Sequence, residues 1–255
     1  MPSILTFAYL RKTLLALGLL AMTACGNDPV TPTDETKNKL HGDPVTARLT
    51  FESVAYDSTT HTYTRQVFGV SPAKQVVNFA IREGEWKPDN VQPLSMLAYR
   101  DELPVSYLLH IDYFDAHGQS MNYQFIENGQ DMIHQHFFMA EAVAIAGLAR
   151  PDLRRTNKLY RYTYLDTTPF AHEPGSAHTM ITGNTNPIGF RGLLQFTQPK
   201  ATLSLNIWLL HALNTQRGKY LDDTHTITAP YYRFTPSQAA GGVWDIKMPI
   251  DLIIH

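Results

Sequence analysis

The chain has 255 residues, with 21 Lys and Arg against 23 Asp and Glu and a single Cys. A hydrophobic fraction of 44%, which includes 13 Tyr and 12 Phe, is enough to bury a core and excludes a globally disordered chain. One Cys excludes an intramolecular disulfide framework and a cysteine-built metal cluster, and the near-neutral charge argues against a nucleic-acid partner.

The N-terminus has the features of a secretory signal. Arg11 and Lys12 form a short positive region, and an uncharged stretch of apolar and small residues runs from Leu14 to Ala24. About 20 apolar residues are needed to span a bilayer, so this stretch is too short for a lasting transmembrane anchor. We therefore assign residues 1–24 to a signal peptide.

The signal ends in a motif that predicts a lipid anchor. Met22-Thr23-Ala24-Cys25 resembles a bacterial lipobox, although Leu is usual where Met22 stands. The resemblance implies cleavage before Cys25 and acylation of that residue with fatty chains such as palmitate. We expect lipidation at Cys25 and attachment to the membrane, at the outer membrane of the cell envelope. The alternative is an ordinary signal peptide with a chance cysteine.

Residues 25–43 follow as a predicted tether. The stretch contains Pro29, Pro32 and several Thr, Asn and Asp residues, and almost nothing apolar. Such a composition cannot bury enough surface to fold, so we expect a solvated linker between the acylated Cys25 and the folded part.

From Pro44 onward the dominant period is two. Val45, Ala47, Leu49 and Phe51 alternate with polar residues, as in a strand with one buried face. The same pattern predicts strands at residues 45–52, 74–81, 105–114, 121–126, 132–139, 159–165, 188–196, 202–211 and 243–254. Residues 141–148 are Ala-rich and fit a short helix or a loop. With no convincing long helix, we expect an all-β protein.

A weak similarity between two parts of the sequence, an internal echo, suggests how the strands are grouped. Leu108-Leu109-His110 precedes a turn at Gly118, and Leu209-Leu210-His211 precedes one at Gly218. Their separation is close to the roughly 100 residues of a β-sandwich domain. We therefore expect two tandem antiparallel β-sandwiches, Ig-like or transthyretin-like, at residues 44–150 and 151–255, in preference to one large barrel.

The strongest candidate for chemistry is His134-Gln135-His136. Residues two apart on a strand point to the same side, so both imidazoles would project together. This geometry suits two ligands on Zn²⁺, Cu²⁺ or Ni²⁺, or an axial ligand to haem iron. Met132 shares their face and could add a thioether ligand. The cofactor is left open between a Zn or Cu ion and haem.

Further ligands are sought on other predicted strands. His110 shares a face with Asp112, and His211 lies near the end of its strand. The opposing interpretation is that the histidines are neutral, hydrogen-bonded core residues, because His134 and His136 occupy places where the echo puts apolar side chains. No hydrolase, P-loop or dinucleotide-binding motif is present in the sequence, so we expect no enzyme.

Several segments together resemble a known class of protein. They are residues 127–138, 164–169, 186–192 and 244–246, taken with the lipobox and the polar tether. They are similar to uncharacterised envelope lipoproteins of Bacteroidota-type bacteria. The resemblance implies association with TonB-dependent receptors that import metals, haem or other scarce nutrients. Family members carry extra histidines in the first strand, where Leu49-Thr50-Phe51-Glu52 has none.

These observations predict an outer-membrane-anchored lipoprotein that binds a transition metal or haem, or that assists transport through a TonB-dependent receptor. Two other functions remain open. A structural or adhesive lipoprotein would bind a protein partner through its aromatic β-surface, with its histidines in the core. A glycan-binding protein would use platforms of Tyr and Trp.

Overall fold

The structure is a computed structural model, and it describes residues 41–66, 72–89, 92–147, 159–183, 185–212, 232–233 and 242–255. The predicted signal peptide, Cys25 and the tether as far as residue 40 lie outside the described residues. Among the residues that are described, no helix is both long and apolar enough to cross a lipid bilayer.

The larger of two main sheets has seven strands, all in antiparallel pairs. Its order is β10-β13-β8-β1-β3-β4, and β2 pairs with the end of β1. The strands are β1 (Thr46–Asp57), β2 (Thr62–Arg65), β3 (Lys74–Arg82), β4 (Glu85–Pro88), β8 (Ser106–Phe114), β10 (Tyr160–Tyr164) and β13 (Arg191–Phe196).

The second sheet has four strands in the order β5-β15-β14-β9, and β5 runs parallel to β15. These strands are β5 (Leu94–Met96), β9 (His134–Ile145), β14 (Ala201–Ala212) and β15 (Gly242–Ile254). Two small strand pairs lie outside the main sheets, β6 (Tyr99–Arg100) with β7 (Leu103–Pro104) and β11 (Thr167–Thr168) with β12 (Met180–Ile181).

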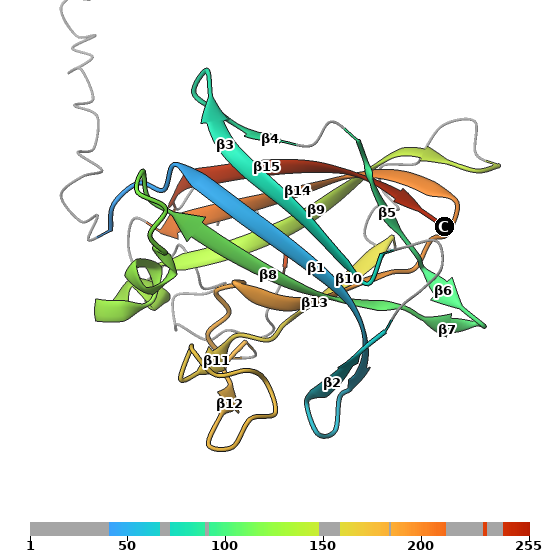
Figure 1. Ribbon diagram of the computed structural model, residues 1–255, viewed down its shortest axis with the longest axis horizontal. Coiled ribbons are helices and arrows are strands. Elements are labelled where there is room, and N and C mark those ends of the chain that lie inside the picture. The colour runs from blue at the N-terminus through green and yellow to red at the C-terminus, as the bar shows by residue number, and fades with distance from the viewer. Residues whose placement is uncertain are drawn as a thin grey trace, which may run out of the picture. The chain divides into compact units, whose positions relative to one another are not determined.

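One hydrophobic core lies between the two main sheets. Alternate residues of β1 and β8, such as Leu49 and Ile111, meet alternate residues of β14 and β15, such as Leu205 and Ile250. This is the arrangement that period-two alternation produces, because each strand buries one face. The seven-stranded sheet lies in front of the four-stranded one in Figure 1. The mostly β character predicted from the sequence is confirmed.

The division into two tandem sandwiches needs correction. Strands β10 and β13, from the predicted second half, pair with β8 from the first half. Likewise β9, from the first half, pairs with β14 from the second. Residues Leu40–His255 accordingly form one compact unit. The two echoed segments lie on β8 and β14, one in each sheet of a single sandwich, so the echo does not mark two domains.

Tyrosines of β10 join the two sheets along the edge formed by β9. The Tyr160 hydroxyl donates to the Phe138 carbonyl oxygen at 2.5 Å and accepts from the Ala140 N–H at 3.2 Å. The Tyr164 hydroxyl donates to the His136 carbonyl oxygen at 2.7 Å. An open strand edge presents unsatisfied backbone groups, so these hydroxyls take the place of a further strand.

Two short 3₁₀ helices, η2 (Asn122–Phe125) and η3 (Glu127–Met132), lead the chain from β8 into β9. Residues 121–126 therefore do not form the strand that alternation predicted. Asn128 and Gly129 have φ of 56° and 79°, the left-handed conformation expected of an Asn-Gly turn. This turn reverses the chain directly before His134, the first residue of β9.

Candidate metal centre

His134 is the first residue of β9, His211 is the last but one of β14, and the two form a cross-strand pair. In the register of the two strands His211 lies directly opposite His134, and both side chains face the interior. Directly opposite residues of antiparallel strands have Cβ atoms about 5 Å apart, which brings their side chains into contact. His134 Nε2 and His211 Nδ1 are 3.2 Å apart.

A third imidazole comes from the segment before β1. His41 Nε2 lies 3.0 Å from His134 Nε2 and 3.4 Å from His211 Nδ1. The His41 ring packs on Phe125 of η2, with centroids 4.3 Å apart, and its side chain is 1% exposed. Its burial corrects the prediction that residues 25–43 form a solvated tether throughout, because at His41 the chain already belongs to the folded body.

A carboxylate from β15 completes the group. Asp245 Oδ2 lies 3.4 Å from His211 Nδ1 and 3.9 Å from His41 Nε2. In the pairing of β14 with β15, Leu209 lies opposite Ile246 and Leu210 opposite Trp244, so Asp245 is an extra residue in a β-bulge. A bulge re-aims the side chain of its extra residue, and here it directs the carboxylate toward the histidines.

The spacing of these four side chains fits a tetrahedral metal site. One ligand atom from each of His41, His134, His211 and Asp245 lies within 4.8 Å of all the others. Zinc–nitrogen bonds of 2.0–2.1 Å place tetrahedral ligand atoms about 3.3 Å apart. The three nitrogen–nitrogen distances of 3.0, 3.2 and 3.4 Å lie around this value.

Backbone carbonyls orient two of the imidazoles toward the centre. His134 Nδ1 lies 2.8 Å from the Gln130 oxygen, and His41 Nδ1 lies 2.9 Å from the Gly42 oxygen. A carbonyl only accepts, so each Nδ1 carries the proton and each Nε2 presents a lone pair. Metal-ligating histidines are held in this way by their other ring nitrogen.

The centre gathers nitrogen and carboxylate oxygen atoms that a single cation can bind. Two Nε2 lone pairs, on His41 and His134, face each other at 3.0 Å. Burial, followed by repulsion from His211 and His41, lowers the pKa of His134 to about 2, so the His134 imidazole is neutral near neutral pH. Asp245 Oδ2 is buried and makes no hydrogen bond within the described part of the chain. A bound cation would satisfy all of these groups together.

The structure separates the two members of the predicted His134/His136 pair. His136 does face the same side as His134, but its Nε2 lies 2.7 Å from the Tyr113 hydroxyl and its Nδ1 lies 2.8 Å from the Ile188 oxygen. Both ring nitrogens thus have protein partners, and burial lowers the pKa of His136 to about 4. His136 is a core histidine, as the opposing interpretation of the sequence expected.

The other predicted ligands have different outcomes. His211 belongs to the cluster. Met132 ends η3 and is half-buried, and its role as a ligand stays a prediction. His110 lies on β8, whose alternate residues Leu109 and Ile111 enter the core, so its side chain points away from the cluster to the outer face of the sheet.

Sequence reasoning missed His41 and Asp245. His41 stands in a polar stretch without periodicity, and its only signal is its place just before the first strand. Asp245 breaks the clean alternation of buried residues that begins at Ile246, which marks a position where a bulge is plausible. No protein-family model, no curated protein and no solved structure matches this chain.

Proposed function

We propose that this protein is a lipid-anchored metal-binding protein of the cell envelope that holds one divalent transition-metal ion. The ligands are His41, His134, His211 and Asp245. The observation that carries the proposal is the convergence of three buried imidazole nitrogens, 3.0–3.4 Å apart, with a carboxylate oxygen 3.4 Å from one of them.

Zinc is the ion that this ligand set suits best. Zn²⁺ takes imidazole and carboxylate ligands in tetrahedral geometry, whereas Mg²⁺ and Ca²⁺ prefer oxygen ligands and Cu(I) prefers sulfur. Haem fits poorly, because four protein atoms within 4.8 Å of one another leave no space for a porphyrin around the same metal.

The ligand count favours a structural, storage or delivery role. Catalytic zinc sites use three protein ligands and keep the fourth position for water or substrate. Here four side chains converge, and the three histidines are at most 7% exposed. The four ligands also come from four separate segments of the chain, so one ion would link the N-terminal segment to β9, β14 and β15.

The place and partner of this metal site are proposed from the sequence. The lipobox at Met22–Cys25 supports acylation of Cys25 and anchoring in the outer membrane. The resemblance to Bacteroidota-type envelope lipoproteins supports a TonB-dependent receptor as partner. In this proposal the lipoprotein retains or delivers metal for an uptake system.

Metal analysis of the purified lipoprotein in detergent tests the proposal. After chelator treatment the protein is titrated with Zn²⁺, Cu²⁺ and haemin in separate experiments. We expect one Zn²⁺ per chain with a Kd of micromolar or tighter, which corresponds to about 8 kcal/mol or more. We expect the His134→Ala/His211→Ala double variant to lose this binding.

Two histidines outside the cluster provide matched controls. His110→Ala and His172→Ala remove an imidazole each at positions outside the four-residue cluster. Both should keep the wild-type stoichiometry. Absence of zinc binding by the wild type, or undiminished binding by the His134→Ala/His211→Ala variant, would rule out the proposed centre.

A groove lined by all three tryptophans of the chain favours glycan binding as a second candidate function. Trp86, Trp208 and Trp244 border a groove of about 580 Å³ together with Asp245 and Lys247. The Trp208 and Trp244 rings meet edge to face at 5.3 Å. Indole faces pack against the C–H faces of sugar rings, and the neighbouring polar groups could bind hydroxyls.

Tryptophan fluorescence during titration with soluble oligosaccharides tests this second candidate. A saturable change in emission that Trp86→Ala abolishes would support it. Tyr99→Ala serves as the control, because Tyr99 is an aromatic residue 41% exposed and does not line this groove. An unchanged spectrum with every oligosaccharide would remove the glycan candidate and leave metal binding untouched.

A further inference from the structure

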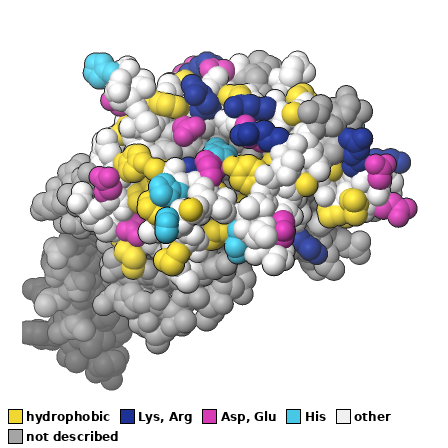
Figure 2. Space-filling view, turned by 60° about the horizontal axis from the view of Figure 1, so that its bottom comes forward, with side chains coloured by type: hydrophobic (Ala, Val, Ile, Leu, Met, Phe, Trp, Pro, Cys, Tyr) yellow, Lys and Arg dark blue, Asp and Glu magenta, His cyan; other side chains and the backbone are white. Residues whose placement is uncertain are grey.

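The outer face of the seven-stranded sheet carries a second, chemically different site. A groove of about 610 Å³ lies over β1, β3 and β8 and is lined mainly by charged side chains. On the face turned forward in Figure 2, Lys and Arg side chains gather beside acidic and histidine side chains. The groove is on the opposite side of the sheet from the core and shares no residue with the metal cluster.

Strand register builds the floor of the groove. Arg48 of β1 lies directly opposite Asp112 of β8, and Thr50 lies directly opposite His110. Directly opposite residues share a face, so these four side chains form two adjacent polar rows. Burial lowers the pKa of His110, which leaves its imidazole neutral near pH 7 with one donor and one acceptor.

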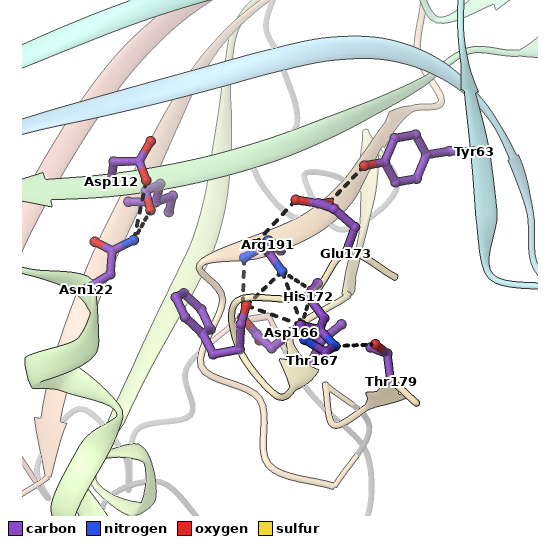
Figure 3. A network of polar contacts seen from close by, with 11 residues as sticks. Tyr63, Asp112, Asn122, Asp166, Thr167, His172, Glu173, Thr179 and Arg191 are labelled. Atoms are coloured by element: carbon purple, nitrogen blue, oxygen red, sulfur yellow. Dashed lines mark hydrogen bonds and ion pairs between the residues drawn. The ribbon is translucent and has the colours of Figure 1, made fainter. Parts of the chain in front are cut away.

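One wall is made by the β1–β2 hairpin and the segment between β11 and β12, which are joined over the sheet. The Tyr63 hydroxyl on β2 donates to Glu173 Oε2 at 2.8 Å, and Arg191 Nη2 on β13 lies 3.4 Å from Glu173 Oε1 (Figure 3). Beneath them Leu108 and Leu193 belong to a small hydrophobic cluster that fixes the overhanging segments to the sheet. The wall is thus held in place before any ligand binds.

Charges at the walled end of the groove are already matched within the protein. Glu52 lies 2.8 Å from Arg65 Nε and 3.5 Å from Lys74 Nζ. Glu173 is held by Tyr63 and Arg191. This end therefore presents polar groups of both signs and little net charge.

The open end differs, because its two opposite charges do not meet. Within the described part of the chain, Arg48 makes no ion pair with Asp112, although the two residues are register neighbours. The Arg48 guanidinium lies over the Phe114 ring, 5.1 Å from its centroid. Among the described residues, Asp112 Oδ1 accepts one long hydrogen bond, 3.5 Å, from Asn122 Nδ2.

We propose that this groove binds a small zwitterion of the α-amino-acid class. The ligand's carboxylate would bind Arg48 and its ammonium would bind Asp112, so that the ligand bridges two neighbouring charged groups that do not form an ion pair with each other. Thr50 and His110 would offer hydrogen bonds to the rest of the molecule. A simple anion fits less well because Glu52, Asp112 and Glu173 all border the groove, and a simple cation meets Arg48, Arg65 and Lys74.

The test is a calorimetric titration of the purified protein with each of the twenty L-amino acids at millimolar concentration. For any amino acid that binds, its N-acetyl derivative and its amide are then titrated. We expect binding of the zwitterion and a loss of about tenfold or more with either derivative, because each lacks one charge-assisted hydrogen bond.

Variants connect such binding to the groove. Arg48→Gln and Asp112→Asn should each weaken it about tenfold or more, whereas Arg82→Gln and Asp89→Asn, which alter an exposed ion pair elsewhere, should not. Amide chemical-shift changes at Thr50 and His110 in the wild-type protein provide a check that needs no variant. The proposal fails if no amino acid binds, if the N-acetyl derivative binds equally well, or if these amides do not respond.

Discussion

His134 on β9 lies directly opposite His211 on β14, and 77 residues of sequence separate two ring nitrogens that are 3.2 Å apart. The pair can exist only when the four-stranded sheet is assembled in its native register. A cation bound there would therefore stabilise the folded state, since the unfolded chain does not hold the two imidazoles together.

Zinc removal is expected to lower thermal stability. At a free metal concentration 100 times the Kd, binding to the folded state adds about 2.7 kcal/mol to the free energy of unfolding. For a chain of this size that corresponds to a rise of about 5–10 °C in Tm. Calorimetric scans with and without chelator measure the shift, and the His134→Ala/His211→Ala variant should show none.

His41 is expected to make the N-terminal segment depend on metal. Replacing His41 with Gln removes one of four ligands, so metal affinity should fall by more than the about 10–100-fold typical of losing an outer-shell partner. Hydrogen exchange should then show faster exchange at Gly42, whose N–H donates to Gln124 Oε1 at 2.9 Å. Unchanged affinity in this variant would remove His41 from the ligand set.

The alternation of apolar and polar residues in the sequence located most strands, because each strand buries one of its two faces. It also placed His134 and His211 on strands. The sequence could not show that these two strands are neighbours, because β9 and β14 pair only within the assembled sheet. The internal echo led to the wrong division into two sandwiches, because it compared β8 with β14, one strand from each sheet.

The remaining two ligands escaped prediction for local physical reasons. His41 is held by contacts with Phe125 and Gly42, and nothing periodic surrounds it in the sequence. Asp245 faces the histidines only because of the bulge between Trp244 and Ile246. Bulges and isolated contacts of this kind depend on partners distant in sequence, whereas alternation depends only on the strand itself.

His136 is expected to make the protein sensitive to acid. Its pKa is about 4 in the folded state, against 6.5 for an unperturbed histidine, because burial disfavours its charged form. Between these values the unfolded chain binds more protons, so stability falls as pH falls below about 6.5. From pH 7 to pH 5 the loss from this group is about 2 kcal/mol.

Urea unfolding in chelator at pH 7 and pH 5 isolates this contribution by comparing the wild type with His136→Gln. The variant should be less stable at pH 7, where its contacts with Tyr113 and Ile188 change, and should lose less stability on acidification. His134 is present in both proteins, so the comparison removes most of its contribution. Identical pH slopes would show that His136 does not titrate in this way.

Tyr160 and Tyr162 offer a matched test of the hydrogen bonds that join β10 to β9. The Tyr160 hydroxyl satisfies backbone groups of Phe138 and Ala140, so Tyr160→Phe should cost about 1–3 kcal/mol. The buried Tyr162 hydroxyl has no hydrogen-bond partner among the described residues, so Tyr162→Phe should be neutral or stabilising. Equal effects in chemical unfolding would contradict the proposed role of the Tyr160 hydroxyl.

Asp166 is expected to be the most sensitive side chain of the loop that supports β9. Its carboxylate accepts four backbone N–H groups, from residues 188–191, at 2.7–3.3 Å, and it is 1% exposed. Ile188 in turn offers its carbonyl oxygen to the backbone N–H and the ring of His136. The Asp166 carboxylate therefore fixes the loop against the strand that begins with His134.

Asp166→Asn keeps the shape and removes the charge, and its amide N–H₂ would face backbone donors. We expect the free energy of unfolding to fall by about 2–4 kcal/mol, because hydrogen bonds to a charged acceptor contribute about 1.5–3 kcal/mol each and part of them would be lost. Asp115→Asn is the control, since Asp115 accepts N–H groups of His117 and Gln119 in an exposed turn. A larger loss for Asp115→Asn than for Asp166→Asn would show that the buried carboxylate does not hold this loop.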